Sequence, residues 1–484
     1  MLVANDYDVV VIGAGTGGYV AAIRASQLGL KVAVVERAPQ LGGTCLVWGC
    51  IPTKALLENA HALKVAQEAV EWGVTGVTSP GIDMTRVHAR KDKIVTGLTK
   101  GIEFLFKKNK IEWIKGSARL LGKGKVEVTD TNTGAQGASG AAGARVLSAK
   151  EIIVATGSSP RSVPGITIDK THIITSDQAI HLKDVPKTMA IMGSGAVGVE
   201  FASIFKRFGA DVTIIELLPR LVPNEDEAVS AELLRAFKKR GIAAKVGTKV
   251  TSAKVKDGKV DIEMVGADGK SAALTVDILL VATGRGPVTE GLGAKEVDLA
   301  LDERGYVKVD TLFRTNVPGI SAIGDVITFG TGAHPQLAHL SSAEGIVLAE
   351  RIAGQTPTPI NYDQIPGCTY CDPEIGSVGL TEAEAKKRGY DVVVGQFPFM
   401  ALGRAKIAGD TDGFVKIVAD KKYDEVLGVH IIGLRATELI AEAGVALKLE
   451  STVEELIRTI HAHPTMSEAV GEAAHAVHGA AIHT

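Results

Sequence analysis

Short apolar runs that end at a glycine or at an acid recur along the chain. Residues 6–13 and 189–193 form two such runs that end at a glycine, and runs at 31–36 and 211–216 each end in a glutamate. Continuous apolar strands of this length are typical of parallel sheets that are buried on both faces. The pattern therefore predicts an α/β protein with two similar domains in tandem.

A glycine-rich turn follows the first strand in both places. Each turn has the spacing Gly-x-Gly-x-x-Gly, and each terminal glutamate lies 23 residues after the first glycine. Such glycines let a helix N-terminus approach a pyrophosphate, and the acid can accept a hydrogen bond from a ribose hydroxyl. The sequence thus predicts two Rossmann-like dinucleotide-binding domains. Their binding residues would be Gly13, Gly15, Gly18 and Glu36 in the first, and Gly193, Gly195, Gly198 and Glu216 in the second.

The remainder of the first 360 residues continues the α/β pattern. We expect helices at 54–72 and 86–108, strands between 111 and 128, and a solvent loop over the Gly/Ala/Ser/Thr-rich run 130–144. A buried strand that ends in Val-Ala-Thr-Gly at 154–157 has a counterpart ending in the same residues at 281–284. The repeat therefore extends to the last strand of each domain.

The pattern changes from about residue 360. Expected strands at 392–399, 413–419 and 426–433 alternate with helices at 381–388 and 435–449, without a nucleotide motif. This order predicts an antiparallel α+β unit. The predicted division is 1–158 and 285–356 for the first dinucleotide-binding domain, 159–284 for the second, and 357–484 for the α+β unit.

Composition narrows the class of protein. A chain of 484 residues with 45% hydrophobic residues is too long for one core, and its net charge of −2 gives no basic face for nucleic acid and no membrane-binding signal. Four cysteines do not make a disulfide scaffold. With no leader-like segment before Asp8, the sequence favours a cytoplasmic protein, in which a disulfide is more often catalytic than structural.

Two of the cysteines lie in a run of turn-forming residues directly after the first nucleotide signature. Cys45 and Cys50 would be about 8 to 9 Å apart on a regular α-helix, which is too far for a disulfide. A bridge requires an irregular helix start, which Gly42, Gly43 and Gly49 permit, and a strained bridge is easily reduced. The spacing therefore suggests a working redox disulfide.

Other interpretations of the cysteines are open. Cys45 and Cys50 could be two buried thiols, or half of a zinc site completed by Cys368 and Cys371, although structural zinc sites favour short Cys-x₂₋₄-Cys pairs on both sides. Cys368 and Cys371 are expected in the first strand of the α+β unit. Because residues three apart on a strand face opposite sides, we interpret them as packing cysteines, and we expect no metal site.

The C-terminal segment carries a possible acid–base pair. Thr452 and Glu455 form a capping box for a helix that Pro464 should stop, and His463 and Glu468 follow in the pattern His-Pro-Thr-x-x-Glu. Glu468 could equally complete a second capping box with Thr465, and the histidine could be a surface residue. The local sequence alone does not decide between these interpretations.

The segment Leu41–Lys54 resembles the redox-active segment of the flavoprotein disulfide reductases, GGTC-x-N-x-GC-[IV]-P-x-K. It departs from it at Val47 and Trp48. Over nearly its whole length the chain resembles the dihydrolipoyl dehydrogenases of that family. The resemblance implies that electrons pass from a dithiol substrate to the disulfide, then to tightly bound FAD, and then to NAD. It also implies a homodimer formed through the α+β unit, and lipoyl domains and the acyltransferase core of a 2-oxoacid dehydrogenase or glycine-cleavage complex as partners.

The same resemblance implies roles for individual residues. Cys45 would exchange with the substrate, Cys50 would face the flavin, and His463, oriented by Glu468, would accept a proton across the dimer. Lys54 would lie by the flavin and pair with Glu200. Flavin contacts would be Glu36, Lys54, Gly116, Thr156, Gly157, Ser158, Asp325, Gln336, Leu337, Ala338 and His339; NAD contacts would be Gly193, Gly195, Gly198, Glu200, Glu216, Val250 and Gly284. Asp325 could also be only a helix cap, and Gln336, Gly286 and Val288 depart from the family pattern.

Glu216 also predicts the choice of nicotinamide cofactor. An acid at this place binds the free 2′-hydroxyl of NAD and repels the 2′-phosphate of NADP. That preference argues against a glutathione reductase, and the C-terminus lacks the cysteine pair typical of a mercuric reductase. Two alternatives remain: an NADH-dependent reductase of another disulfide, and a protein that acts mainly as a binding subunit of a multienzyme complex.

Overall fold

The fold is described from a computed structural model that covers residues 5–130, 144–330 and 334–484. The described chain divides into two compact units. Unit 1 comprises residues 1–55, 88–161 and 285–360, and unit 2 comprises 56–87, 162–284 and 361–484. The boundaries pass through α2 (Cys50–Gln67) and α3 (Met84–Lys108), so each of these helices belongs partly to both units.

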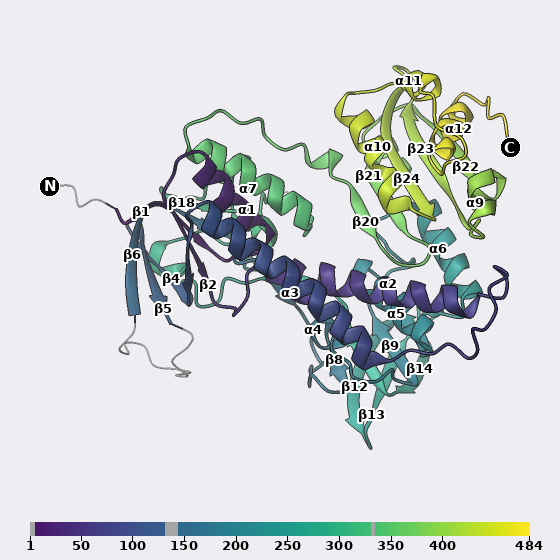
Figure 1. Ribbon diagram of the computed structural model, residues 1–484, viewed down its shortest axis with the longest axis horizontal. Helices are drawn as coiled ribbons and strands as arrows, with labels where there is room; N and C mark the ends of the chain where they lie inside the picture. The colour runs from purple at the N-terminus through teal and green to yellow at the C-terminus, as the bar shows by residue number, and fades with distance from the viewer. Residues whose placement is uncertain (1–4, 131–143, 331–333) are drawn as a thin grey trace. The chain divides into compact units, whose positions relative to one another are not determined.

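Unit 1 is built on a parallel sheet in the order β3-β2-β1-β6, with β18 on the far side of β6. The central strands are buried almost completely because they carry apolar side chains on both faces. Helix α1 (Thr16–Gln27) packs beside α7 (Ala338–Ile352) (Figure 1). The strands are β1 (Tyr7–Ile12), β2 (Val32–Glu36), β3 (Glu112–Lys115), β6 (Ala144–Val154) and β18 (Ile320–Ala322).

Antiparallel strands extend this unit. β4 (Ser117–Gly122) and β5 (Lys125–Thr129) pair with the first half of β6, as the sequence predicted for a strand-rich region here. The predicted solvent loop at 130–144 falls mostly on residues 131–143, which lie outside the described residues. Two short strands pair with each other where the chain leaves and re-enters the unit. They are β7 (Ser158–Pro160) and β16 (Arg285–Pro287).

The first part of unit 2 repeats the architecture of unit 1. Its parallel sheet has the order β11-β10-β9-β15-β8, and the first four strands follow the chain order of β3-β2-β1-β6. The fifth strand differs, because β8 precedes β9 in the chain whereas β18 follows β6. Helix α5 (Ala196–Phe208) follows the second glycine turn, and α6 (Glu227–Lys239) joins β10 to β11. A β-meander of β12, β13 and β14 precedes β15. The strands are β8 (Ile173–Ile174), β9 (Thr188–Met192), β10 (Asp211–Ile215), β11 (Ala243–Lys245), β12 (Lys249–Lys256), β13 (Lys259–Val265), β14 (Ser271–Val276) and β15 (Ile278–Val281).

The last part of unit 2 is the predicted antiparallel α+β unit. Its sheet has the order β20-β21-β24-β23-β22, and α10 (Ala436–Lys448) and α12 (Glu468–Val477) pack against it. The strands are β20 (Gly367–Thr369), β21 (Ile375–Gly379), β22 (Val392–Pro398), β23 (Gly413–Asp420) and β24 (Glu425–Gly433). The short helices of this part are α8 (Glu382–Lys387), α9 (Gly403–Ile407) and α11 (Val453–Arg458), whereas α4 (Ser176–Ala179) lies between β8 and β9 in the first part of unit 2.

Three sequence-based expectations need local correction. The helix expected at 54–72 begins earlier, at Cys50, and ends at Gln67, after which residues 68–73 form turns. Cys371 lies beyond β20, which ends at Thr369, so the two cysteines diverge because a turn separates them. Helix α11 ends at Arg458, well before Pro464, because the backbone becomes extended at Thr459.

None of the helices in the described ranges has the length and apolar character that a bilayer crossing requires.

Candidate active site

The segment Leu41–Lys54, here called the redox segment, begins where the chain passes over the first glycine turn. The Gly42 amide donates to the carbonyl of Ala14, and a Cβ on Gly43 would come within 2.6 Å of the Gly15 Cα. Gly42 and Gly43 have φ values of 115° and 57°, which favour glycine. The glycines therefore let the redox segment lie directly on the turn.

A π-helical turn separates the two cysteines. It spans Thr44–Trp48, and α2 then begins at Cys50. A π-turn closes hydrogen bonds over five residues, which is the separation of Cys45 and Cys50. The irregular helix start expected from the sequence is thus present, and it brings the two side chains into contact.

Cys45 and Cys50 are both partly buried. A hydrogen bond with Cys50, together with burial, raises the pKa of the Cys45 thiol, whereas the charge of Lys54 acts in the opposite direction. A thiol with a raised pKa ionises poorly, and the thiolate is the species that exchanges. A base or a further cation near Cys45 would favour its thiolate.

Asp325, Ser158 and Arg285 form a polar group close to the redox segment. Ser158 Oγ donates to Asp325 Oδ2 at 2.6 Å, and Arg285 Nε donates to Ser158 Oγ at 2.8 Å. Arg285 Nη2 also reaches Thr44 Oγ1 at 3.3 Å. Burial raises the pKa of Asp325, while the Ser158 hydroxyl counteracts this. The structure therefore gathers Asp325 and Ser158 beside the cysteines.

The first glycine turn fits a dinucleotide. A Cβ on Gly13 or Gly18 would collide with backbone at 2.4 or 2.0 Å, so these two glycines are needed for packing. A Cβ on Gly15 would meet only Gly43, at 4.0 Å, which leaves the helix N-terminus approachable. Glu36 lies at this edge and accepts hydrogen bonds from the Ala14 and Ala38 amides at 2.7 and 2.8 Å.

Further predicted flavin contacts lie around the same edge of the sheet. The Gly116 amide donates to the Glu36 carbonyl, and Gln336 Nε2 lies 3.4 Å from the Tyr306 hydroxyl. The hydroxyl of Thr156 is buried and has no hydrogen-bond partner among the described residues. A buried hydroxyl without a partner is costly unless a ligand satisfies it. These residues fit an FAD held against unit 1.

The second glycine turn repeats the first. A Cβ on Gly193 or Gly198 would collide with backbone at 2.4 or 2.1 Å, whereas one on Gly195 would meet nothing within 4 Å. Glu216 accepts from the Ser194 amide at 2.8 Å and from the Leu218 amide at 2.8 Å. Gly284 has a φ of 113°, and a Cβ there would also enter open space. This turn fits a second dinucleotide.

The predicted acid–base pair is formed in unit 2. His463 Nδ1 lies 2.8 Å from Glu468 Oε1, and the Thr465 amide donates to Glu468 Oε2 at 2.8 Å. Glu468 thus orients the histidine and also accepts the amide of Thr465. The alternative capping box with Thr465 is not formed, because α12 begins at Glu468 itself after an N-cap at Ser467. Burial alone would raise the pKa of Glu468, but the hydrogen bonds from His463 and Thr465 lower it. The pair lines a pocket of about 340 Å³ whose wall includes His461, Glu472 and His483.

Glu200 and Lys54 belong to different units, so their predicted pairing remains a prediction. Glu200 is almost completely buried, and its Oε1 accepts a hydrogen bond from the Tyr370 amide at 2.9 Å. Val250 lies on β12. His339 lies in the first turn of α7, next to Leu337 and Ala338.

Cys368 and Cys371 turn toward different cores. Cys368 packs against the apolar core of the α+β unit, whereas Cys371 is buried in a different apolar cluster, which includes Phe201 and Phe205 of α5. Burial raises the pKa of Cys371 well above its usual value. These positions are consistent with packing roles. In the described ranges no three His, Cys, Asp or Glu side chains gather as a metal site requires.

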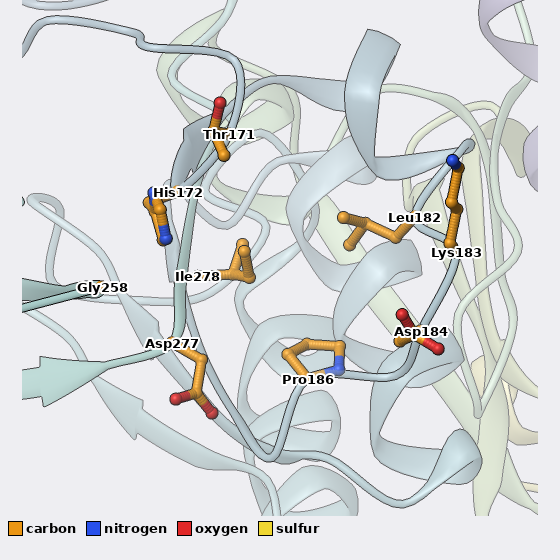
Figure 2. A pocket seen from close by; sticks show the side chains of 9 residues that line it. All are labelled: Thr171, His172, Leu182, Lys183, Asp184, Pro186, Gly258, Asp277 and Ile278. Carbon is orange, nitrogen blue, oxygen red and sulfur yellow. The ribbon is translucent and has the colours of Figure 1, made fainter.

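One hollow of about 300 Å³ lies at the edge of the second parallel sheet (Figure 2). His172, Lys183, Asp184 and Asp277 contribute its polar groups, and Leu182, Pro186 and Ile278 its apolar ones. No residue predicted to bind a cofactor lines it, so we do not assign it to the active site.

Sequence reasoning missed Arg285. Its guanidinium joins the Thr44 hydroxyl, at the start of the π-turn, to Ser158. The signal was present, because Arg285 directly follows the second Val-Ala-Thr-Gly turn. The contacts themselves join positions 241 and 127 residues apart, which no local pattern reveals.

Comparison with known protein families decides the assignment. Residues 7–345 match the pyridine nucleotide-disulphide oxidoreductase family, and residues 365–474 match its dimerisation domain. The chain belongs to this family. Membership confirms the predictions of an oxidoreductase that uses FAD and NAD, of two dinucleotide-binding domains and of a dimerisation domain, which supports a homodimer.

Similar members of the family cover almost the entire chain. A dihydrolipoyl dehydrogenase from Bacillus subtilis is 44% identical over 481 residues, which cover 99% of this chain and 100% of the relative. The mitochondrial dihydrolipoyl dehydrogenase of Pisum sativum is 41% identical, with 99% and 93% covered. Among solved structures, the Cu(II) complex of the HOCl-induced flavoprotein disulfide reductase RclA from Escherichia coli matches with a TM-score of 0.85 at 27% identity, covering 97% of this chain and 99% of that one.

Proposed function

We propose that this oxidoreductase is a dihydrolipoyl dehydrogenase, which reoxidises protein-bound dihydrolipoamide and reduces NAD. The observation that carries the proposal is the His463–Glu468 pair, in which the imidazole Nδ1 is held at 2.8 Å by a carboxylate. When Nδ1 donates its proton to this carboxylate, Nε2 is unprotonated and can accept a proton. This is the tautomer that a general base needs. The names of the similar relatives point to the same activity.

The proposed dithiol reaction is a pair of exchanges. In the oxidised enzyme a substrate thiolate attacks the Cys45 sulfur of the Cys45–Cys50 disulfide, forms a mixed disulfide and releases Cys50 as a thiolate. The second substrate thiol then attacks the substrate sulfur, which closes the cyclic disulfide and releases Cys45. His463 of the partner subunit accepts the proton from the substrate thiol.

The structure offers a physical reason for that base. The pKa of Cys45 is raised by its hydrogen bond with Cys50 and by burial, so unit 1 by itself favours the neutral thiol. An imidazolium near Cys45 would stabilise the thiolate. Bound FAD would accept the electron pair from the thiols and pass it to NAD as a hydride.

The expected preference for NAD is supported by the surroundings of Glu216. The two residues after it, Leu217 and Leu218, are exposed apolar side chains. The nearest arginine in sequence, Arg220, already contacts Glu227 at 2.7 Å and the Pro223 carbonyl at 2.8 Å. No cation in this stretch is therefore directed at a 2′-phosphate.

The deciding experiment compares substrates. Purified holoenzyme should reduce NAD with dihydrolipoamide much faster than it oxidises NADH with glutathione disulfide, a thioredoxin-like disulfide or mercuric ion. Faster turnover of another disulfide would instead support the alternative, an NADH-dependent reductase of that substrate. Val47 and Trp48, which replace the usual residues of the redox segment, are the reason to include that comparison.

The partners follow from the proposed reaction. A dihydrolipoyl dehydrogenase acts on lipoyl groups carried by proteins, so we propose lipoyl domains and the acyltransferase core of a 2-oxoacid dehydrogenase or glycine-cleavage complex. A pull-down with acyltransferase cores would test this, and complex formation by an inactive variant would show a binding role separate from catalysis. The cytoplasmic location also remains a prediction, which cell fractionation would test.

A further inference from the structure

The turn Tyr370–Asp372, here called the docking turn, links the α+β unit to helix α5. It follows β20 and lies against the face of α5 that carries Glu200, Ser203 and Arg207. These three positions recur at helical spacing, so they line one side of the helix. The docking turn therefore runs along α5 immediately beyond the second glycine turn.

The backbone of the docking turn binds α5 at two points. The Tyr370 amide donates to Glu200 Oε1 at 2.9 Å, and the Asp372 amide donates to Ser203 Oγ at 3.1 Å. Glu200 is 3% exposed and Ser203 is 2% exposed, so both bonds are shielded from water. A hydrogen bond to a buried carboxylate is stronger than a neutral one and fixes the orientation of the acid.

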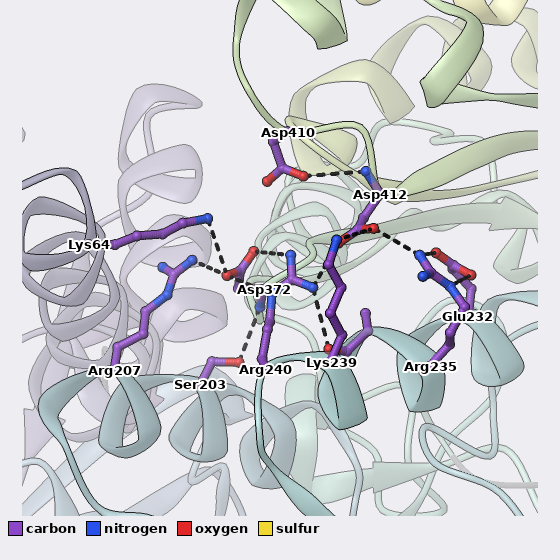
Figure 3. A network of polar contacts seen from close by, with 11 residues as sticks. Lys64, Ser203, Arg207, Glu232, Arg235, Lys239, Arg240, Asp372, Asp410 and Asp412 are labelled. Atoms are coloured by element: carbon purple, nitrogen blue, oxygen red, sulfur yellow. Dashed lines mark hydrogen bonds and ion pairs between the residues drawn. The ribbon is translucent and has the colours of Figure 1, made fainter. Parts of the chain in front are cut away.

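The side chain of Asp372 fixes the docking turn in place. Its carboxylate contacts Arg207 of α5, Arg240 at 3.0 Å and Lys64 of α2 at 3.9 Å (Figure 3). The side chain is 15% exposed, and although burial would raise its pKa, Arg207 and Arg240 lower the pKa below its usual value. Asp372 therefore remains ionised and holds the turn against two helices.

We propose that Asp372 is a positioning residue for the exchange of a hydride with NAD, acting through the Tyr370 amide on Glu200. The inference rests on the proposed function and on the expectation, implied by the family resemblance, that Glu200 contacts NAD. Loss of the Asp372 charge would loosen the docking turn, and the Tyr370 amide would hold the Glu200 carboxylate less firmly. A misplaced group near a reacting centre lowers the rate of that step.

A second aspartate in the same cluster provides a matched control. Asp412 binds Arg235 at 2.8 Å, Lys239 at 3.1 Å and Arg240 at 3.0 Å, and it shares Arg240 with Asp372 (Figure 3). Its backbone amide is directed to Asp410 and not to α5. Asp372→Asn and Asp412→Asn therefore remove one charge each from the same cluster, but only Asp372 belongs to the docking turn.

The test separates the two half-reactions of the holoenzyme by anaerobic stopped-flow absorbance of the flavin. Asp372→Asn should slow flavin reduction by NADH about tenfold and leave reduction by dihydrolipoamide nearly unchanged. Asp412→Asn should leave both rates nearly unchanged, and Asp372→Glu should restore part of the NADH rate. Equal slowing in the two Asn variants, or equal slowing of both half-reactions, would overturn the inference, because either result indicates general destabilisation.

Glu200→Gln distinguishes failure of this inference from failure of the proposed function. If Asp372 acts through Glu200, adding Asp372→Asn to Glu200→Gln should slow the NADH step no further. Additive effects would overturn the inference while leaving the role of Glu200 intact. A wild-type enzyme that fails to reduce NAD with dihydrolipoamide would instead refute the proposed function.

Discussion

The two dinucleotide-binding parts have the same amide hydrogen bonds around Glu36 and Glu216, and the match extends to six residues beyond each of these acids. Glu36 and Glu216 each accept an amide from the glycine turn and a second amide two residues later. Six residues after each acid, an amide then returns to the turn: Gly42 donates to Ala14, and Val222 donates to Ser194. The two parts separate only after this point.

Beyond this point, different segments follow the two acids, and in the described ranges only the first glycine turn has a segment lying directly on it. In unit 1, Gly43 crosses Gly15 and the chain enters the π-turn that carries Cys45. In unit 2, Asp226 caps α6 by accepting the Ala228 amide, and the Cβ position of Gly195 remains open. The first dinucleotide would therefore lie under the redox segment, whereas the second would bind to an open turn and exchange. The comparison accounts for one retained and one exchanged cofactor.

The largest effect should come from the redox segment, which only the first part has. Cys50→Ser should reduce dithiol-dependent NAD reduction to the background rate, because no intramolecular disulfide can form, while the flavin remains bound. The assay is NAD reduction by dihydrolipoamide, with the flavin content measured from absorbance. Cys368→Ser is the control, since Cys368 packs in the α+β unit, and it should remain active. Substantial lipoamide turnover by Cys50→Ser would contradict the mechanism.

Paired glycine substitutions should affect different cofactors. A Cβ on Gly18 would lie 2.0 Å from the Gly13 carbonyl oxygen, and one on Gly198 would lie 2.1 Å from that of Gly193. Each collision should cost about 1–3 kcal/mol, because backbone must move. Gly18→Ala should lower flavin retention, whereas Gly198→Ala should retain flavin and raise the KM for NAD about tenfold or more.

The readouts for this pair are the flavin-to-protein ratio after gel filtration and steady-state kinetics in NAD. Loss of flavin from Gly198→Ala with unimpaired NAD binding would reverse the assignment of the two turns.

Substitution of Glu216 or Glu36 should also affect one cofactor at a time, but less strongly than the glycine substitutions. Glu216→Gln keeps the shape of the side chain but removes the charge that accepts from Ser194 and Leu218. The preference for NAD over NADP should fall about tenfold, corresponding to one charged hydrogen bond, when the kcat/KM values are compared. Glu36→Gln serves as the counterpart and should weaken flavin retention without altering that preference. Unchanged selectivity in Glu216→Gln would refute the role assigned to this acid.

The sequence was sufficient for the parts that depend on local pattern. The alternation of apolar runs and glycine turns located both parallel sheets, and the five-residue spacing of Cys45 and Cys50 predicted an irregular helix start, which the π-turn provides. In each case the interacting residues are close in sequence, or they repeat a motif whose geometry is fixed. The contact between His463 and Glu468 was left open by the local sequence and was implied only by the resemblance to the family.

Contacts between distant segments could not be predicted in this way. Arg285 binds Thr44, and the Tyr370 amide binds Glu200, across 241 and 170 residues. Glu468 contacts His463 with one carboxylate oxygen and accepts the Thr465 amide with the other, although no capping box with Thr465 forms, since α12 begins at Glu468 after an N-cap at Ser467. Such dual use appears only when the side chains are placed.

The smallest predicted effect concerns α6. This helix lies after the second glycine turn, at the place that the redox segment takes after the first. Arg235, Lys239 and Arg240 at its C-terminal end bind Asp412, and although burial would raise the pKa of Asp412, these cations lower it from 3.8 to about 2. The resulting stabilisation is fully present above about pH 4 and is lost as the pH falls toward 2. Because Arg235 and Lys239 are more than half exposed, we expect it to contribute only about 1 kcal/mol. Denaturant unfolding of wild type and Asp412→Asn should therefore differ by that amount at pH 7, and the difference should shrink below pH 4. A difference that did not depend on pH would mean that packing, and not charge, holds α6 at this end.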